Sequence, residues 1–277
     1  MKLSRTICAS YNKAIEDGFN AYLEKNATSE KCDLRIDEGK LINEIEGKWL
    51  DKTIEGMGTT ARQYIESIDG FEDVIDFFIE FAELSDVGVP DIVLDKLKKY
   101  PKEASDKLFS FVLDIFDQQK PENNIAASQA VYAIGSLGTP EYSKLLPQLL
   151  NKTYDNEMLS ESVCAAISEY GADALDDIIE AYGNSTNNEV KQYLLTCVVE
   201  ATREQKSDKA FYFLKEAFRQ SGNIQVELEV LGDYGDSRAI PMLRGYVQKN
   251  REQLSKQILN NFLAVIKKLG GDIDDLL

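Results

Sequence analysis

The 277-residue sequence contains no histidine. Histidine is the base in Ser-His and Cys-His nucleophilic pairs and the commonest protein ligand of metal ions. Its absence excludes these pairs and every His-ligated metal site. We therefore expect no catalytic, cofactor-binding or metal-binding residues, no cofactor and no enzymatic activity.

Cysteine is scarce, and the four cysteines, Cys8, Cys32, Cys164 and Cys197, form no CxxC pair. Their spacing is too wide for half of a zinc site. We expect them to be small buried hydrophobic side chains in a reducing compartment. Apolar runs are also short, and none approaches the ~18 residues of a membrane span. Since Lys2 and Arg5 precede no apolar run either, we expect a cytoplasmic protein that does not contact membranes.

Basic residues are outnumbered, with 31 Lys and Arg against 48 Asp and Glu and a net charge of −17. Nucleic acids and membrane surfaces are anionic, so a chain this acidic would need a strong local basic groove to bind them. Residues 121–190 hold 2 basic and 11 acidic side chains, whereas residues 191–277 hold 13 and 12. The acidic net charge favours a protein or peptide as the partner, and a basic partner is one alternative. It predicts no binding of nucleic acid. The oligomeric state stays open.

A repeated helix–break–helix pattern is the main feature that is present. Gly138 and Gly171 each end an apolar helical segment and lie 33 residues apart, and Gly235 follows after 64 residues, or two periods of 32. Arg203 occupies the skipped break, and Gly270 marks a looser copy. Such a period predicts an array of helix pairs.

Aligned columns of apolar residues before each break support this register. The columns read Val131, Cys164, Thr196 and Leu228; Ala133, Ala166, Val198 and Val230; and Ile134, Ile167, Val199 and Leu231. Glycine at each break predicts a left-handed helix end. The residues expected to start the second helices are Thr139 with Pro140, Asp173, Ser207 and Asp236.

The stretch LGDYGDSRAIPML resembles the HEAT-like repeat unit that also occurs in phycobilisome-lyase-type repeat proteins. The matching residues are Leu231, Gly232, Gly235, Asp236, Arg238, Ala239, Ile240, Pro241 and Leu243. The resemblance covers about residues 125–250. It implies an all-α, right-handed α-α superhelix of antiparallel helix pairs, with the second helices lining a concave face. It also implies that Asp236 and Arg238 serve the structure rather than a reaction.

The expected organisation has three parts in one continuous array. Residues 1–57 would form an N-terminal helical cap, residues 58–124 degenerate helical repeats and residues 125–277 the HEAT-like repeats. The last part holds the candidate partner-binding residues, which lie in the acidic second helix and in later repeats. They are Asp173, Asp176, Asp177, Glu180, Tyr212, Lys215, Arg219 and Arg244.

Asp173, Asp177 and Glu180 share one flank of a helix at i, i+4, i+7 spacing. The flank could dock a basic partner, or its charges could only solvate an exposed face, and carboxylates on one rigid helix cannot surround a metal ion. We expect a non-enzymatic scaffold or regulatory protein that binds a partner on its concave face. The alternatives are a DNA alkyl-base glycosylase, for which Trp49 would be an aromatic candidate rather than a buried anchor, and a bilin-lyase-like maturation factor.

Overall fold

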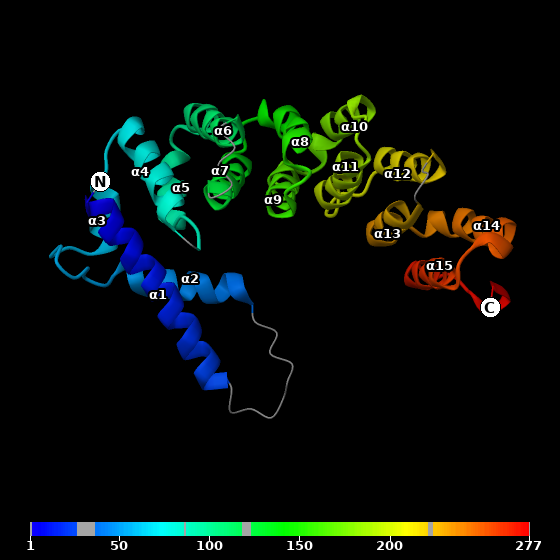
Figure 1. The fold of residues 1–277 in the computed structure, drawn as a ribbon, viewed down its shortest axis with the longest axis horizontal. Coiled ribbons are helices and arrows are strands. Elements are labelled where there is room, and N and C mark those ends of the chain that lie inside the picture. Colours follow the sequence, from blue (N-terminus) through cyan, green and yellow to red (C-terminus); the bar gives the residue numbers. More distant parts are fainter. Residues whose placement is uncertain (1, 27–36, 86, 118–122, 221–223, 277) are drawn as a thin grey trace. The chain divides into compact units, whose positions relative to one another are not determined.

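The computed structural model describes residues 2–26, 37–85, 87–117, 123–220 and 224–276, and Cys32 lies outside these ranges. Within them the chain forms fifteen α-helices and short 3-10 turns, and no strand is present there (Figure 1). The expectation of an all-α protein is confirmed. The chain divides into two compact units, residues 1–139 and 140–277.

The described residues of the first unit form seven α-helices. α4 supplies much of its core, because Phe77, Phe78 and Phe81 are all buried. α6 packs against α7, and α4 packs against both α1 and α7. The helices are α1 (Lys2–Asn26), α2 (Glu38–Leu50), α3 (Ala61–Ser67), α4 (Phe71–Leu84), α5 (Asp91–Leu97), α6 (Pro101–Asp117) and α7 (Asn124–Leu137).

A buried carboxylate joins α1, α2 and α5. Glu46 accepts hydrogen bonds from the Tyr11 hydroxyl at 3.2 Å and from the Asp91 backbone N–H at 3.1 Å. Beside it, Trp49 Nε1 donates to Ser10 Oγ at 2.8 Å, and the Trp49 ring packs edge-on against Tyr11 at 4.8 Å between centroids. Trp49 is 4 % exposed, so its interpretation as a buried anchor is confirmed.

The second unit contains eight α-helices in two rows (Figure 1). In one row α9 packs against α11, α11 against α13 and α13 against α15, while α8 packs against α10 in the other row. The helices are α8 (Tyr142–Thr153), α9 (Glu157–Ser168), α10 (Leu175–Asn184), α11 (Asn188–Ala201), α12 (Asp208–Gln220), α13 (Ile224–Tyr234), α14 (Ile240–Asn250) and α15 (Lys256–Lys268). The first helices of the pairs thus form one row, and the second helices, which follow the breaks, form the other.

The glycines at the breaks adopt the conformation that the sequence predicts. Gly138, Gly171, Gly235 and Gly270 have φ angles of 63°, 57°, 70° and 88°, in the left-handed region that favours glycine. Gly138 caps the end of α7 directly. The break at Arg203 lacks a glycine, and there an irregular turn leads from α11 to α12.

One of the four predicted helix starts is confirmed, because Ser207 Oγ accepts a hydrogen bond from Ala210 N at 3.1 Å at the start of α12. Asp236 accepts one from the Arg238 backbone N–H at 2.9 Å, but it caps the 3-10 turn Ser237–Ala239, and α14 begins only at Ile240. The Asp173 prediction is wrong, because α10 begins at Leu175 after a 3-10 turn and no side chain caps it. The start at Thr139 and Pro140 is also wrong, because α8 begins at Tyr142 and its N-cap residue is Glu141. Thr139 Oγ1 donates to the Pro101 carbonyl at 3.0 Å.

The predicted core columns are buried except at one position. Thr196 is exposed, whereas Leu195 and Cys197 on either side of it are buried. Matching burial therefore aligns Cys164 with Leu195 and Ala166 with Cys197, one residue earlier than the sequence register. The prediction for Thr196 is wrong because the third break has no glycine to mark its position.

Candidate functional site

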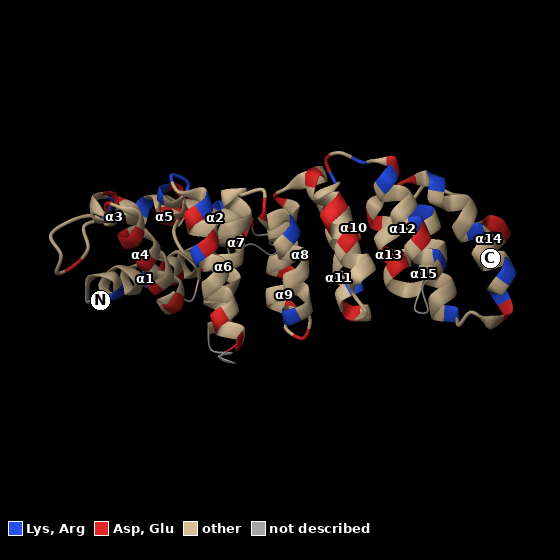
Figure 2. Ribbon diagram, turned by 90° about the horizontal axis from the view of Figure 1, so that it is seen from above, with Lys and Arg blue, Asp and Glu red and all other residues tan. Residues whose placement is uncertain are grey.

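The predicted carboxylates lie on α10 and in the turn before it. Ile178 and Leu175 bury the opposite side of this helix, which leaves Asp176 and Glu180 exposed and Asp177 half-buried. Asp173 is exposed in the 3-10 turn Gly171–Ala174. Figure 2 shows the acidic bands that result along α10.

Each α10 carboxylate contacts a neighbouring helix of the same row. Glu180 forms an ion pair with Lys144 of α8 at 3.0 Å. Asp177 accepts a hydrogen bond from Ser143 Oγ, and Asp176 pairs with Lys209 of α12. The carboxylates therefore connect α10 to the second helices before and after it, in addition to facing solvent.

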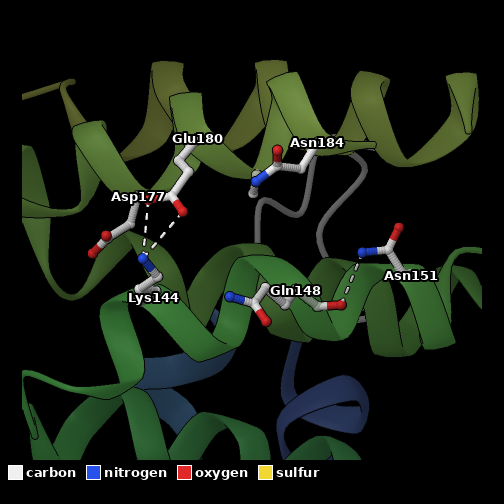
Figure 3. Close-up of a pocket in the computed structure, with 7 residues that line it drawn as sticks. Lys144, Gln148, Asn151, Asp177, Glu180 and Asn184 are labelled. Atoms are coloured by element: carbon white, nitrogen blue, oxygen red, sulfur yellow. Dashed lines mark hydrogen bonds and ion pairs between the residues drawn. The ribbon is translucent and has the colours of Figure 1, made fainter. Parts of the chain in front are cut away.

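A surface pocket of about 350 Å³ lies between α8 and α10 (Figure 3). Asp177 and Glu180 belong to its lining, together with Lys144 and the carboxamide side chains of Gln148, Asn151 and Asn184. In Figure 3, Glu180 and Asn184 extend from α10 toward α8. Each carboxamide offers two N–H donors and a carbonyl acceptor. The pocket thus combines negative charge with groups that can pair with a peptide backbone.

α12 supplies an exposed aromatic residue on the same row. Tyr212 is 57 % exposed, and the Lys215 ammonium lies 5.9 Å from its ring centroid. The Arg238 guanidinium also lies 5.9 Å from the Tyr212 ring and stacks on Phe211 at 4.3 Å. Tyr212 therefore presents an exposed aromatic ring with two cations over it.

Arg219 and Arg244, the remaining predicted basic residues, are held by carboxylates. Arg219 lies 3.6 Å from Glu216 on its own helix. Arg244 pairs with Asp275 at 2.7 Å, and this contact lowers the pKa of the Asp275 carboxyl. The structure thus places Arg244 away from the α8–α10 pocket, against the C-terminal turn Asp274–Leu276.

Asp236 and Arg238 are structural, as the sequence predicts. Arg238 pairs with Asp236 and with Asp208 of the preceding helix pair, each at 2.7 Å. The hydrogen bonds from Arg238 lower the pKa of the Asp236 carboxyl, and those to Asp236 raise the pKa of the Arg238 guanidinium. This arginine ties one repeat to the next.

Sequence reasoning missed Lys144 and the three carboxamides of the pocket. The sequence contains a signal that could have found Lys144, because the contacts between successive second helices join residues about one repeat period apart. The separations are 34 residues for Ser143–Asp177, 36 for Lys144–Glu180, and 33 for Asp176–Lys209. Searching for complementary side chains at this spacing would have found Lys144 as the partner of Glu180.

A second pocket, of about 460 Å³, lies in the first unit. Its lining includes Asp73 and Asp76 of α4 and the aromatic rings of Tyr64 and Phe77. The described residues contain no group of three or more Cys, Asp or Glu side chains arranged to hold a metal ion. Those residues also include no helix with the length and apolar character needed to cross a membrane.

Comparisons with protein-family models, curated proteins and solved structures found no match to this chain. The HEAT-like resemblance consequently rests on the motif residues and on the helix pairs. The candidate site rests on its own geometry.

Proposed function

We propose that this chain is a HEAT-like α-solenoid that binds a basic protein or peptide through the pocket between α8 and α10. The repeated helix pairs, the left-handed glycines and the contacts from one second helix to the next support a solenoid in the second unit. Arrays of this kind expose long surfaces that suit partner binding.

The pocket itself carries the proposal. Asp177 and Glu180 offer carboxylates to an incoming Lys or Arg side chain, and Gln148, Asn151 and Asn184 can pair with the N–H and C=O groups of an extended backbone. Figure 1 shows α8 and α10 on the outer side of the bend of the second unit. We therefore assign binding to the second-helix row and not to the concave face that the resemblance implies.

Binding requires the Glu180–Lys144 ion pair to open, and this step costs little free energy. The two side chains are 55 % and 53 % exposed. Exposed ion pairs contribute only about 0–1 kcal/mol. A peptide cation that also gains backbone hydrogen bonds can displace Lys144 from Glu180. Tyr212, farther along the row on α12, offers an aromatic contact to a longer partner.

The test uses two fluorescein-labelled peptides of equal length, a Gly-Ser peptide with three Lys residues and its counterpart with three Glu residues. Fluorescence anisotropy should show binding of the Lys peptide alone, weakening as salt rises. The double variant Asp177→Asn/Glu180→Gln should lower its affinity by roughly five- to tenfold, since each of the two ion pairs that it removes contributes up to about 1 kcal/mol.

The matched control is Asp73→Asn/Asp76→Asn, which removes the same charge from the pocket of the first unit. It should leave the affinity within about twofold, because neither residue lines the α8–α10 pocket. Equal losses in both double variants would mean that only the net charge attracts the peptide, and the proposed site would be wrong.

A further inference from the structure

Two buried thiols of consecutive first helices meet in the second unit. Cys164 lies on α9 and Cys197 on α11, and their sulfur atoms are 2.8 Å apart. The Cys197 thiol donates to the Cys164 sulfur, and the Cys164 thiol donates to the Tyr193 backbone oxygen at 3.7 Å. A disulfide bond needs about 2.05 Å between the sulfurs, so bond formation requires only a small approach.

The two thiols differ in access. Cys164 is 6 % exposed, whereas Cys197 is completely buried. Burial, and next the hydrogen bond with Cys164, raises the pKa of the Cys197 thiol, which therefore stays protonated near neutral pH. An oxidant arriving from solvent meets Cys164 first, and it must be small to reach a sulfur with so little exposure.

We propose that Cys164 and Cys197 form a modification site, a dithiol that hydrogen peroxide closes to a disulfide between α9 and α11. Cys164 is the attacking sulfur and Cys197 is the resolving sulfur. Neither residue lines the α8–α10 pocket, so the proposal stands independently of peptide binding.

The chemistry balances in two steps. The Cys164 thiolate attacks one peroxide oxygen; an S–O bond forms, the O–O bond breaks, and hydroxide leaves and takes up the proton that Cys164 released, giving water and a sulfenic acid. Cys197 then loses its proton and attacks the Cys164 sulfur. An S–S bond forms, the S–O bond breaks, and the leaving hydroxide takes up the Cys197 proton as a second water. Two thiols are oxidised by two electrons, and peroxide is reduced.

The experiment uses the full chain with Cys32→Ser, which removes the cysteine outside the described residues. The folded protein is treated with hydrogen peroxide, the peroxide is removed, the protein is unfolded in urea so that all remaining thiols can be alkylated, and peptides are mapped without reduction. We expect one linked peptide pair joining Cys164 to Cys197, and two fewer alkylated thiols than in protein not treated with peroxide. Dithiothreitol should restore both thiols, because it reduces a disulfide but not a sulfinic acid.

Single variants separate the two roles. Cys164→Ser should leave Cys197 fully alkylatable after peroxide, because the exposed sulfur is gone. Cys197→Ser should instead carry Cys164 on to sulfinic acid, since nothing resolves the sulfenic acid. Cys8→Ser is the matched control, as Cys8 is equally buried but lies in the first unit, where it contacts the Phe81 carbonyl. It should behave like the parent.

Three outcomes would overturn the proposal: alkylation of both thiols unchanged after peroxide, a disulfide that forms only in urea, or a pair that includes Cys8. If a serine variant fails to fold, which circular dichroism would reveal, peptide mapping of the parent alone still decides whether Cys164 and Cys197 are linked.

Discussion

Glu46 offers the sharpest test of how the first unit is held together. The carboxylate is 8 % exposed and accepts hydrogen bonds from Tyr11 and Asp91. Burial, and then repulsion from Asp91, raises the pKa of Glu46 despite those two hydrogen bonds. The desolvation cost of the charge therefore exceeds what the hydrogen bonds return, and a neutral group of the same shape should be tolerated there.

We expect Glu46→Gln and Glu46→Ala to differ widely. Glutamine keeps both contacts, because its carbonyl can accept from Asp91 N–H and its amide can donate to the Tyr11 hydroxyl. Alanine leaves the hydroxyl of Tyr11, which is 2 % exposed, without this partner. An unpaired buried group costs about 1–3 kcal/mol, and the lost methylene packing brings the expected Ala penalty to about 2–4 kcal/mol. The Gln variant should be neutral or more stable at pH 7.

The pH dependence of Glu46→Gln follows from the direction of the shift. The folded chain keeps the Glu46 proton to a higher pH than the unfolded chain, whose glutamate pKa is about 4.3. Between those two pKa values the folded state binds more protons, so the parent loses stability as pH rises and regains it as pH falls. The stability of the parent minus that of Glu46→Gln should therefore decrease from about pH 4 upward and level off above the folded pKa.

Trp49 provides the assay. It is the one tryptophan of the chain, is buried, and lies on the same helix as Glu46, so its emission reports unfolding of the first unit. Urea titrations at several pH values would give the free energies of unfolding, with Glu44→Gln, an exposed site on α2, as the control. A Gln penalty as large as that of Ala, or a parent–Gln difference that is constant with pH, would refute the reasoning.

The remaining predictions concern the second unit. The Cys164–Cys197 disulfide closes a loop of about 33 residues and should stabilise the unit by about 3–4 kcal/mol toward urea, whereas no change would mean a distorted link. Arg238→Ala should lower the thermal midpoint, because it removes the ion pairs with Asp208 and Asp236 and the stacking on Phe211; a midpoint equal to the parent's would contradict this. Gly235→Ala, at positive φ, should cost about 1–2 kcal/mol, while Gly183→Ala, in the last turn of α10 where an added Cβ meets no atom, should stabilise by less than about 1 kcal/mol, both read from circular dichroism melts.

Most of the helix pairing could be predicted from the sequence because glycine and apolar periodicity carry direct physical meaning. Gly138 and Gly235 end helices in a conformation that other residues rarely adopt, so their positions mark breaks reliably. Where that marker is missing, at Arg203, the predicted register is one residue late and Thr196 is assigned to the core. Apolar periodicity predicts which face of a helix is buried, but it does not predict the length of an irregular turn between two helices.

The candidate site was only partly predictable, for a different reason. Spacing placed Asp177 and Glu180 on one flank of a helix, which the structure reproduces. It did not reveal that Lys144, more than thirty positions earlier, would pair with Glu180, because that contact depends on how adjacent helix pairs stack. Whether the flank docks a partner stays a prediction that the peptide titration decides.

The irregular turn between α11 and α12 has a practical consequence for labelling the protein. Residues 203–206 are exposed in this turn. The apolar faces of α11 and α12 are buried on either side of it, although the turn departs from the pattern of the other breaks. Added chain length in such a segment costs little, about 0.6 kcal/mol for each doubling of loop length. A short epitope or dye-acceptor peptide inserted between Glu204 and Gln205 should leave both rows of helices of the second unit in place, giving a reporter between α11 and α12.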